Sequence, residues 1–200
     1  MKILIVGATG LIGGAVANAL SANHEIISAG YSDGDVKVDL GSKASIEAMF
    51  RAIGTVDAVI STAGLAGFAP FNELDDAAYD LALGNKLMGQ VNLVRAGRNH
   101  ITEGGSFTLT AGILSRDPMP GSVVISIANG ALESFAKAAA LELDRGLRVN
   151  TVSPVFVKET MEMMGMDSSS GLSAADTAKA YVAAIEGAMS GKTLDAPDYV

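Results

Sequence analysis

The first turn of the chain carries residues whose type and spacing suit phosphate binding. Three glycines fall in the run Gly7-Ala8-Thr9-Gly10-Leu11-Ile12-Gly13, directly after an Ile-Leu-Ile-Val segment. Glycines at this spacing let backbone N–H groups approach phosphate oxygens closely, and the N-terminus of the helix that follows adds positive partial charge. The spacing therefore predicts a site for the pyrophosphate of a dinucleotide. The alternative is a tight turn that binds nothing.

The elements that position this turn follow from an alternation of short apolar runs with longer segments of helical period. That alternation is typical of βαβ units and predicts an α/β fold, a Rossmann-type doubly wound parallel sheet with helices on both faces. Seven strands are expected, in the order 3-2-1-4-5-6-7, at Lys2–Val6, Glu25–Ala29, Val36–Val38, Asp57–Ser61, Ser106–Thr110, Arg148–Val152 and Thr193–Tyr199. Helices are expected at Leu11–Ala22, Lys43–Ile53, Asp75–Leu83, Lys86–Arg98, Val123–Asp144 and Ala174–Met189. Because no linker interrupts this pattern, residues 1–200 are expected to form one domain.

Composition argues against several classes of function. The chain has 200 residues, of which 49% are apolar and 18% charged, which is enough material for a large core. A net charge of −8 would repel nucleic acid and anionic lipid, so neither is expected as a partner. With no cysteine and two histidines, no metal site is expected. No apolar run has the length of a membrane span, and the first strand begins without a basic leader, so we expect a cytoplasmic protein.

Beyond the glycine turn, the sequence resembles the short-chain dehydrogenase/reductase family over essentially its whole length. The resemblance rests on Val38-Asp39-Leu40, Ser61-Thr62-Ala63-Gly64, Asn85, Gly104-Gly105-Ser106-Phe107 and Leu147-Arg148-Val149-Asn150-Thr151-Val152-Ser153-Pro154. It implies that Asp39 contacts the adenine amino group and that residues 61–64 lie beside the adenosine. It also implies that Asn85 stabilises the helix lining the active site, and that the backbone of Val157, after Pro154, faces the nicotinamide carboxamide.

The sequence departs from the family where the family performs its chemistry. The resemblance implies a tyrosine as general acid or base and a lysine four residues later, but Ile125 and Asn129 align with these positions. An isoleucine has no proton to exchange, and a neutral amide cannot depress a neighbour's pKa as an ammonium does. The family's serine falls near Gly112, and a small shift of the alignment brings in Thr110 or Ser115. A hydroxyl alone would orient a substrate rather than supply a proton at neutral pH.

Four residues remain as candidates for catalytic roles, namely Asn85, Lys86, Thr110 and Asn129. Lys86 could relay the proton because a desolvated lysine titrates near neutrality, and the alternative is a surface lysine on an exposed helix face. Asn129 would hold the nicotinamide ribose. Two functions therefore stay open. One is an NAD(P)-dependent oxidoreductase that acts on a small carbonyl or hydroxyl compound by hydride transfer with an atypical proton donor. The other is a non-catalytic dinucleotide-binding sensor or regulatory protein.

The choice between NADP and NAD depends on the residues after the second strand, where an acid favours NAD and a following arginine favours NADP. Gly30, Tyr31 and Ser32 stand there. The missing acid removes a barrier to a 2′-phosphate and Ser32 could bond one, so we expect NADP by a small margin. Tyr31 would stack on the adenine or lie half exposed in its loop.

Two further expectations concern the substrate and the oligomer. Four methionines, Met161, Met163, Met164 and Met166, lie where the family carries a lid over its small-molecule substrate, with core filling as the alternative. The helices expected at Lys86–Arg98 and Val123–Asp144 have small apolar faces, which resemble those that join subunits in this family. A homodimer or homotetramer is therefore expected.

Overall fold

The computed structural model describes residues 1–200 and contains one sheet of seven strands in the predicted order, β3-β2-β1-β4-β5-β6-β7. The strands are β1 (Lys2–Val6), β2 (Glu25–Gly30), β3 (Val36–Lys37), β4 (Val56–Ser61), β5 (Ile101–Thr110), β6 (Arg148–Ser153) and β7 (Thr193–Asp195). All neighbouring strands pair in parallel, so their carboxyl ends share one edge of the sheet. The turn at residues 7–13 lies at that edge because β1 ends at Val6.

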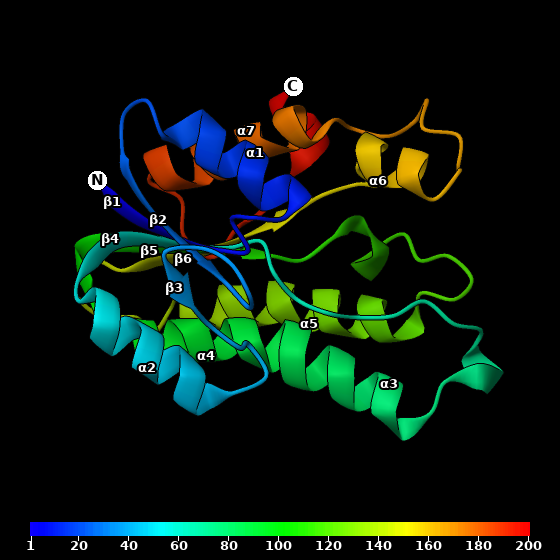
Figure 1. Ribbon diagram of the computed structural model, residues 1–200, viewed down its shortest axis with the longest axis horizontal. Coiled ribbons are helices and arrows are strands. Elements are labelled where there is room, and N and C mark those ends of the chain that lie inside the picture. The colour runs from blue at the N-terminus through cyan, green and yellow to red at the C-terminus, as the bar shows by residue number, and fades with distance from the viewer.

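Helices cover both faces of the sheet. Figure 1 shows α1 (Leu11–Leu20) and α7 (Ala174–Glu186) on one face, with α2 (Lys43–Ile53), α4 (Met88–Gly97) and α5 (Val123–Ala139) on the other. The shorter α3 (Asp76–Leu81) precedes α4, and α6 (Lys158–Met163) follows β6. Three helices begin at a side-chain cap, since Ser42, Asp75 and Ser173 each accept a hydrogen bond from a backbone N–H three residues later.

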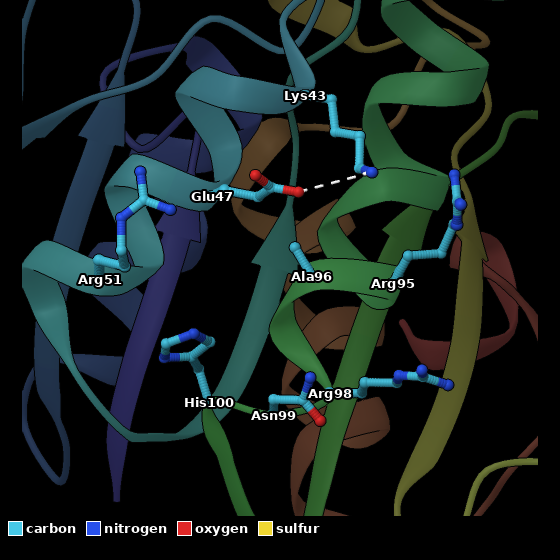
Figure 2. Close-up of a pocket in the computed structure, with 8 residues that line it drawn as sticks. All are labelled: Lys43, Glu47, Arg51, Arg95, Ala96, Arg98, Asn99 and His100. Atoms are coloured by element: carbon cyan, nitrogen blue, oxygen red, sulfur yellow. Dashed lines mark ion pairs between the residues drawn. The ribbon is translucent and has the colours of Figure 1, made fainter.

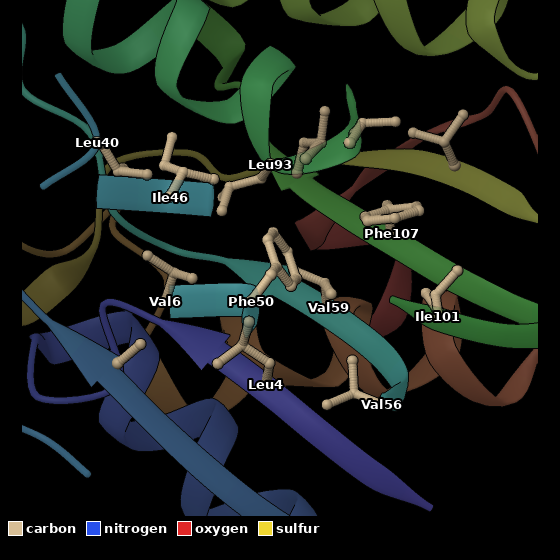
Figure 3. Close-up of a cluster of buried hydrophobic side chains, with 14 of the residues drawn as sticks. Leu4, Val6, Leu40, Ile46, Phe50, Val56, Val59, Leu93, Ile101 and Phe107 are labelled. Atoms are coloured by element: carbon tan, nitrogen blue, oxygen red, sulfur yellow. The ribbon is translucent and has the colours of Figure 1, made fainter. Parts of the chain in front are cut away.

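The central strands are buried on both sides. Ile3 and Ile5 belong to the apolar cluster beneath α1 and α7, whereas Leu4 and Val6 pack in the opposite cluster with Phe50 of α2 (Figure 3). Alternate side chains of a strand point to opposite faces, so an unbroken apolar run is what a sheet with two covered faces requires. Packing on both faces holds the strands in place, and the candidate site lies at the carboxyl edge of the sheet that they form.

The segment that joins α3 to α4 differs from the prediction. The sequence predicts two helices with a break between Leu83 and Lys86, but the structure has a continuous helical segment in which Ala82–Leu87 form a π-helix. A π-helix carries i→i+5 hydrogen bonds, and such segments occur often at functional sites. The wider turn changes the direction in which Asn85 and Lys86 project from the helix.

Several element ends also differ from the prediction. β5 begins at Ile101 rather than Ser106, because Ile101 pairs with Val56 ahead of an irregularity in the ladder. α5 ends at Ala139 rather than Asp144, because the chain turns back toward β6 through Arg145 and Gly146, both with positive φ. β7 ends at Asp195, and residues 196–199 form a 3-10 turn. None of the helices combines the length and the hydropathy that crossing a bilayer requires.

Candidate active site

A cavity of about 360 Å³ lies at the carboxyl ends of β1, β2 and β4. Its walls come from the glycine turn, the ends of β2 and β3, the segment after β4, and one residue of the π-helix. Most of the residues that the sequence assigns to the adenosine half of a dinucleotide line it, namely Gly7, Thr9, Gly10, Tyr31, Asp39, Leu40, Thr62, Ala63 and Gly64. Ligands of open α/β sheets bind at this edge, beyond the carboxyl ends of the strands.

The glycine turn has the geometry of a phosphate cradle. Gly7 has a φ of 91°, and a Cβ on Gly13 would lie 2.0 Å from the carbonyl oxygen of Gly7, so side chains at these positions are excluded. Gly10 is the N-cap of α1 and supplies no side-chain hydrogen bond to the helix. The first N–H groups of α1 therefore have no side-chain acceptor at the N-cap, and they can bind the pyrophosphate of a dinucleotide. The residues present fit that group.

The adenosine end of this cavity holds one acid and no cation. Asp39 accepts a hydrogen bond from Gly41 N–H through Oδ1 at 2.8 Å, and its side chain lines the cavity. Tyr31 lines it too and is 79% exposed, so most of its side chain is accessible to a ligand. Ser32 donates its hydroxyl to Asp33 at 2.8 Å and lies outside the lining. The charge at this end does not favour a 2′-phosphate.

A second cavity, of about 190 Å³, lies beside α5 at the ends of β5 and β6. Four residues assigned to the cofactor or to catalysis line it, namely Ile12, Asn129, Pro154 and Val157. Ile125 lines it as well, one helical turn before Asn129, so the two residues share one face of α5. No tyrosine and no titratable side chain is part of this lining.

Asn129 is a buried polar residue with unused hydrogen-bonding capacity. Its side chain is almost completely buried, and Nδ2 donates a long hydrogen bond of 3.4 Å to the carbonyl oxygen of Gly112. Oδ1 has no partner at all. A buried polar atom without a partner is costly, so Asn129 is suited to accept a hydrogen bond from a ligand hydroxyl or amide.

Lys86 lies between the two cavities. It is buried, its Nζ donates a single long hydrogen bond of 3.5 Å to the carbonyl oxygen of Ala111, and no carboxylate pairs with it. A Cβ on Gly64 would lie 2.9 Å from Lys86 Cγ. Gly64 lines the first cavity and Ala111 lines the second. Burial lowers the pKa of the Lys86 ammonium to about 8, so both protonation states are accessible near neutral pH.

Comparison with known proteins identifies the fold and its family. A family model described as enoyl-(acyl carrier protein) reductase matches residues 10–186. A solved structure of a protein from Listeria innocua is 40% identical, covers 98% of each chain and superposes with a TM-score of 0.94. The chain belongs to the short-chain dehydrogenase/reductase family. Members of this family bind NAD(P).

Two further relatives bear on the site. A solved small-chain dehydrogenase in complex with NADPH is 28% identical, covers 98% of this chain and 95% of its own, and has a TM-score of 0.88. An uncharacterized oxidoreductase of Methylorubrum extorquens is 26% identical over 77% of this chain and 72% of its own length. The chain spans 58% of the length of the fungal reductases that it also matches.

Asn85, which the family resemblance predicts to stabilise the helix lining the active site, faces the first cavity. Its Oδ1 accepts a hydrogen bond from Leu65 N–H at 2.9 Å, and the side chain is part of the lining. Lys86, the next residue in the π-helix, projects toward Ala111 instead. The structure therefore places Asn85 on the cofactor side and Lys86 at the boundary with the second cavity.

Thr110 lies in neither cavity. Its hydroxyl is 2.6 Å from both the carbonyl oxygen of Ser61 and the phenol of Tyr181, and burial raises the pKa of that phenol. Tyr181 belongs to the core beneath α1 and α7, which is the sheet face opposite α5. Thr110 is thus a structural link between β4, β5 and α7, and its hydroxyl does not face the nicotinamide side.

Ser115, a candidate for the family's serine, lies outside the lining of the second cavity and belongs to a polar network whose contacts the sequence does not predict. Ser115 donates to the buried Glu133 at 2.7 Å, and Arg116 Nε lies 3.5 Å from the same carboxylate. The Arg116 guanidinium also donates to Ser153 at 2.9 Å and to Asp195, and this pairing lowers the pKa of Asp195. The network ties the loop after β5 to α5, β6 and β7. Glu133 and Asp195 lie far from Arg116 in the sequence, so no local sequence pattern predicts that they contact it.

The methionines after β6 do not line the second cavity. Met161 is buried and packs against Gly171, as the core-filling alternative predicts, while Met163, Met164 and Met166 are exposed. Thr160 of α6 is the residue that reaches the cavity. Four other predicted site residues lie outside both linings, namely Leu11, Gly13, Ser32 and Lys86.

A third cavity, of about 380 Å³, lies between α2 and α4 near the amino ends of β4 and β5 (Figure 2). Arg51, Arg95 and Arg98 border it, and Figure 2 shows Arg51 on the α2 side, apart from Arg95 and Arg98 on the α4 side. These arginines stand in or beside the last turns of α2 and α4, where cations stabilise the negative end of the helix dipole. The same dipoles oppose a bound anion, so the charges there are explained by the helices.

Proposed function

We propose that the chain is an NAD(P)H-dependent oxidoreductase that reduces a small carbonyl compound, or oxidises the corresponding alcohol, with Lys86 as the proton donor. The observation that supports it most is the position of Lys86, buried without a counter-ion between the cofactor cavity and the second cavity. NADPH in a relative that is 28% identical supports the choice of cofactor class.

The residues that would hold the dinucleotide come from both cavities. The backbone of residues 7–13 would bind the pyrophosphate, and Asp39 with residues 62–64 would hold the adenosine. Asn129 Oδ1, which lacks a partner, would accept a hydrogen bond from the nicotinamide ribose, and the backbone at Val157 would face the carboxamide. When bound, the reduced dinucleotide supplies a hydride to the substrate carbon.

The role of Lys86 follows from its protonation. During reduction the carbonyl carbon gains a C–H bond, and the electron pair of the C=O π bond moves to oxygen. The Lys86 ammonium donates its proton to that oxygen, which gives the alcohol, and neutral Lys86 then recovers a proton from solvent. Alcohol oxidation runs the same steps in reverse. A pKa of about 8 suits both directions, because donor and acceptor forms coexist near neutral pH.

Cofactor binding is tested by the thermal stability of the protein with NAD, NADH, NADP and NADPH. A dinucleotide at about 100 times its dissociation constant should add about 2.7 kcal/mol to the free energy of unfolding. The absence of a shift with all four compounds would refute the proposal.

Catalysis is tested by following NADPH and NADH absorbance with a panel of aldehydes and ketones. Lys86→Met should lower kcat by at least about 100-fold with little change in the dinucleotide dissociation constant, because general acid catalysis contributes about that much. Lys137→Met, which removes an exposed lysine of α5, is the matched control and should leave kcat unchanged. An undiminished rate in Lys86→Met would exclude Lys86 as the donor.

A second function, a dinucleotide-binding sensor or regulatory protein without turnover, is favoured by Ile125 at the position of the family's tyrosine. It predicts a thermal shift with a dinucleotide and no consumption of NADPH or NADH with any carbonyl compound. Both proposals predict a thermal shift with a dinucleotide. Only the oxidoreductase predicts that NADPH or NADH is consumed with a carbonyl compound.

We also propose that the protein forms a homodimer or homotetramer through α4 and α5. Met88 of α4 and Ile127 of α5 are 38% and 44% exposed, which leaves apolar surface on both helices. Light scattering of the protein in solution measures the mass directly, and a monomer at all concentrations would contradict the proposal.

A further inference from the structure

The wall of the second cavity is almost entirely apolar. Ile113, Leu114, Ile125 and Val155 line it, and its polar side chains are the neutral Asn129 and Thr160. No side chain in this lining carries a charge. A charged ligand group would therefore be desolvated there without an ionic partner, which is costly.

Two aromatic rings stand over the same cavity from loops far apart in the sequence. Phe68 follows β4 and Phe156 follows β6, and their ring centroids lie 6.3 Å apart with an interplanar angle of 37°. Both rings line the cavity, and Phe68 remains 46% exposed. Such an exposed apolar surface at a cavity mouth marks a binding site for an apolar group.

Two cations near this cavity, Arg116 and Lys86, are engaged by other groups, and the exposed Lys158 of α6 is not part of the lining. Arg116 is held by Glu133, Ser153 and Asp195 behind the wall. The Nζ atom of Lys86 donates a hydrogen bond to the carbonyl oxygen of Ala111, and in the proposed chemistry it gives its proton to the substrate oxygen. The net charge of −8 adds a field that repels anions from the whole surface.

We infer that the substrate is an uncharged, apolar carbonyl compound, such as an aryl aldehyde or ketone, whose ring packs against Phe68 and Phe156. This inference rests on the proposed function and adds the chemical class of its substrate. Carboxylates and phosphates of the same size are disfavoured, because no side chain in the lining is charged and the proposed mechanism directs the Lys86 ammonium to the reacting oxygen.

The test uses a pair of ligands that differ in charge and share the reacting group. Methyl 4-(hydroxymethyl)benzoate and 4-(hydroxymethyl)benzoate are titrated by calorimetry into the protein loaded with its tighter-binding reduced dinucleotide, with which an alcohol cannot react. The ester should bind at least about 30-fold more tightly than the carboxylate. Equal or tighter binding of the carboxylate, or no binding of either alcohol, would overturn the inference.

A pair of variants tests whether the aromatic mouth sets this preference. Phe68→Lys places a cation in the lining and should reduce the ester preference to below about 5-fold, with the dinucleotide dissociation constant unchanged. Phe71→Lys changes a side chain that is 72% exposed and outside the lining, and it should keep the full preference. An unchanged preference in Phe68→Lys overturns the placement of the ring at Phe68.

Turnover of the matching aldehydes separates this inference from the proposed function. Methyl 4-formylbenzoate should be reduced with a higher kcat/KM than 4-formylbenzoate by the same factor. If the alcohols show the binding preference and neither aldehyde is reduced, the apolar site stands and the proposed chemistry fails.

Discussion

The first cavity, which is predicted to hold the adenosine, and the second cavity both lie along the carboxyl edge of the sheet. Their walls are built in different ways. The first is built largely from backbone, with Gly7 and Gly13 fixed by steric exclusion and α1 presenting an N-terminus without a side-chain cap. The second is lined by side chains, among them Ile125 and Asn129, which the sequence alignment predicts to replace the family's tyrosine and lysine. A backbone site tolerates sequence change as long as its glycines remain, whereas a side-chain site changes its chemistry with one substitution.

The largest expected effect comes from breaking the backbone site. Gly13→Ala places a Cβ 2.0 Å from the carbonyl oxygen of Gly7, so the turn or α1 must move. We expect dinucleotide affinity to fall by at least about 100-fold, because phosphate contacts depend on the position of the helix N-terminus. Calorimetric titration with NADPH measures this change.

The neighbouring residue provides the control for that variant. A Cβ on Gly14 would lie 3.6 Å from the carbonyl oxygen of Ala8, which is an ordinary contact. Gly14→Ala should therefore keep full affinity and gain some helix stability. Equal loss in both variants would show that the close approach at Gly13 is not what shapes the site.

A smaller effect is expected from the side-chain site. Asn129→Leu removes a buried Oδ1 that has no partner, so the free energy of unfolding should stay the same or rise. The affinity for the reduced dinucleotide should fall by about 10-fold, the value of one hydrogen bond to a ligand. Stability from urea unfolding and affinity from titration should thus move in opposite directions. A loss of stability with unchanged affinity would make Asn129 a structural residue.

The smallest effect concerns the 2′ group of the cofactor. Neither an acid at the end of β2 nor a cation lines the cavity, so the dissociation constants of NADPH and NADH should differ by less than about 10-fold. Asp33→Asn removes the carboxylate that accepts a hydrogen bond from the Ser32 hydroxyl. It should strengthen NADPH binding relative to NADH binding by about 3-fold, since an exposed charge contributes little. A shift toward NADH would show that Asp33 does not face the 2′ position.

The order of the strands and the glycine turn could be predicted because both depend on local patterns in the sequence. Apolar runs such as Ile3–Val6 fix the buried strands, and the spacing of Gly7, Gly10 and Gly13 fixes the first turn. The structure confirms the seven-stranded order that these patterns predict.

The inner parts of the site could not be predicted, because they depend on helix register and on tertiary contacts. The direction of Lys86 follows from the π-helix at Ala82–Leu87, which has no distinct sequence signal. The hydroxyl of Thr110 faces Tyr181 because β5 packs on α7 from that side. The contact of Arg116 with Glu133 and Asp195 joins segments that only the folded sheet brings together.

The central claim, that Lys86 donates the proton, is tested most directly by the pH dependence of hydride transfer. The single-turnover rate constant for carbonyl reduction should fall as pH rises through about 8, because the ammonium form of Lys86 is lost above its pKa. Alcohol oxidation should show the opposite trend, since it needs the neutral amine. In Lys86→Met the remaining rate should lack this break. A rate constant that does not change across pH 8, or the same break in Lys86→Met, would contradict the account.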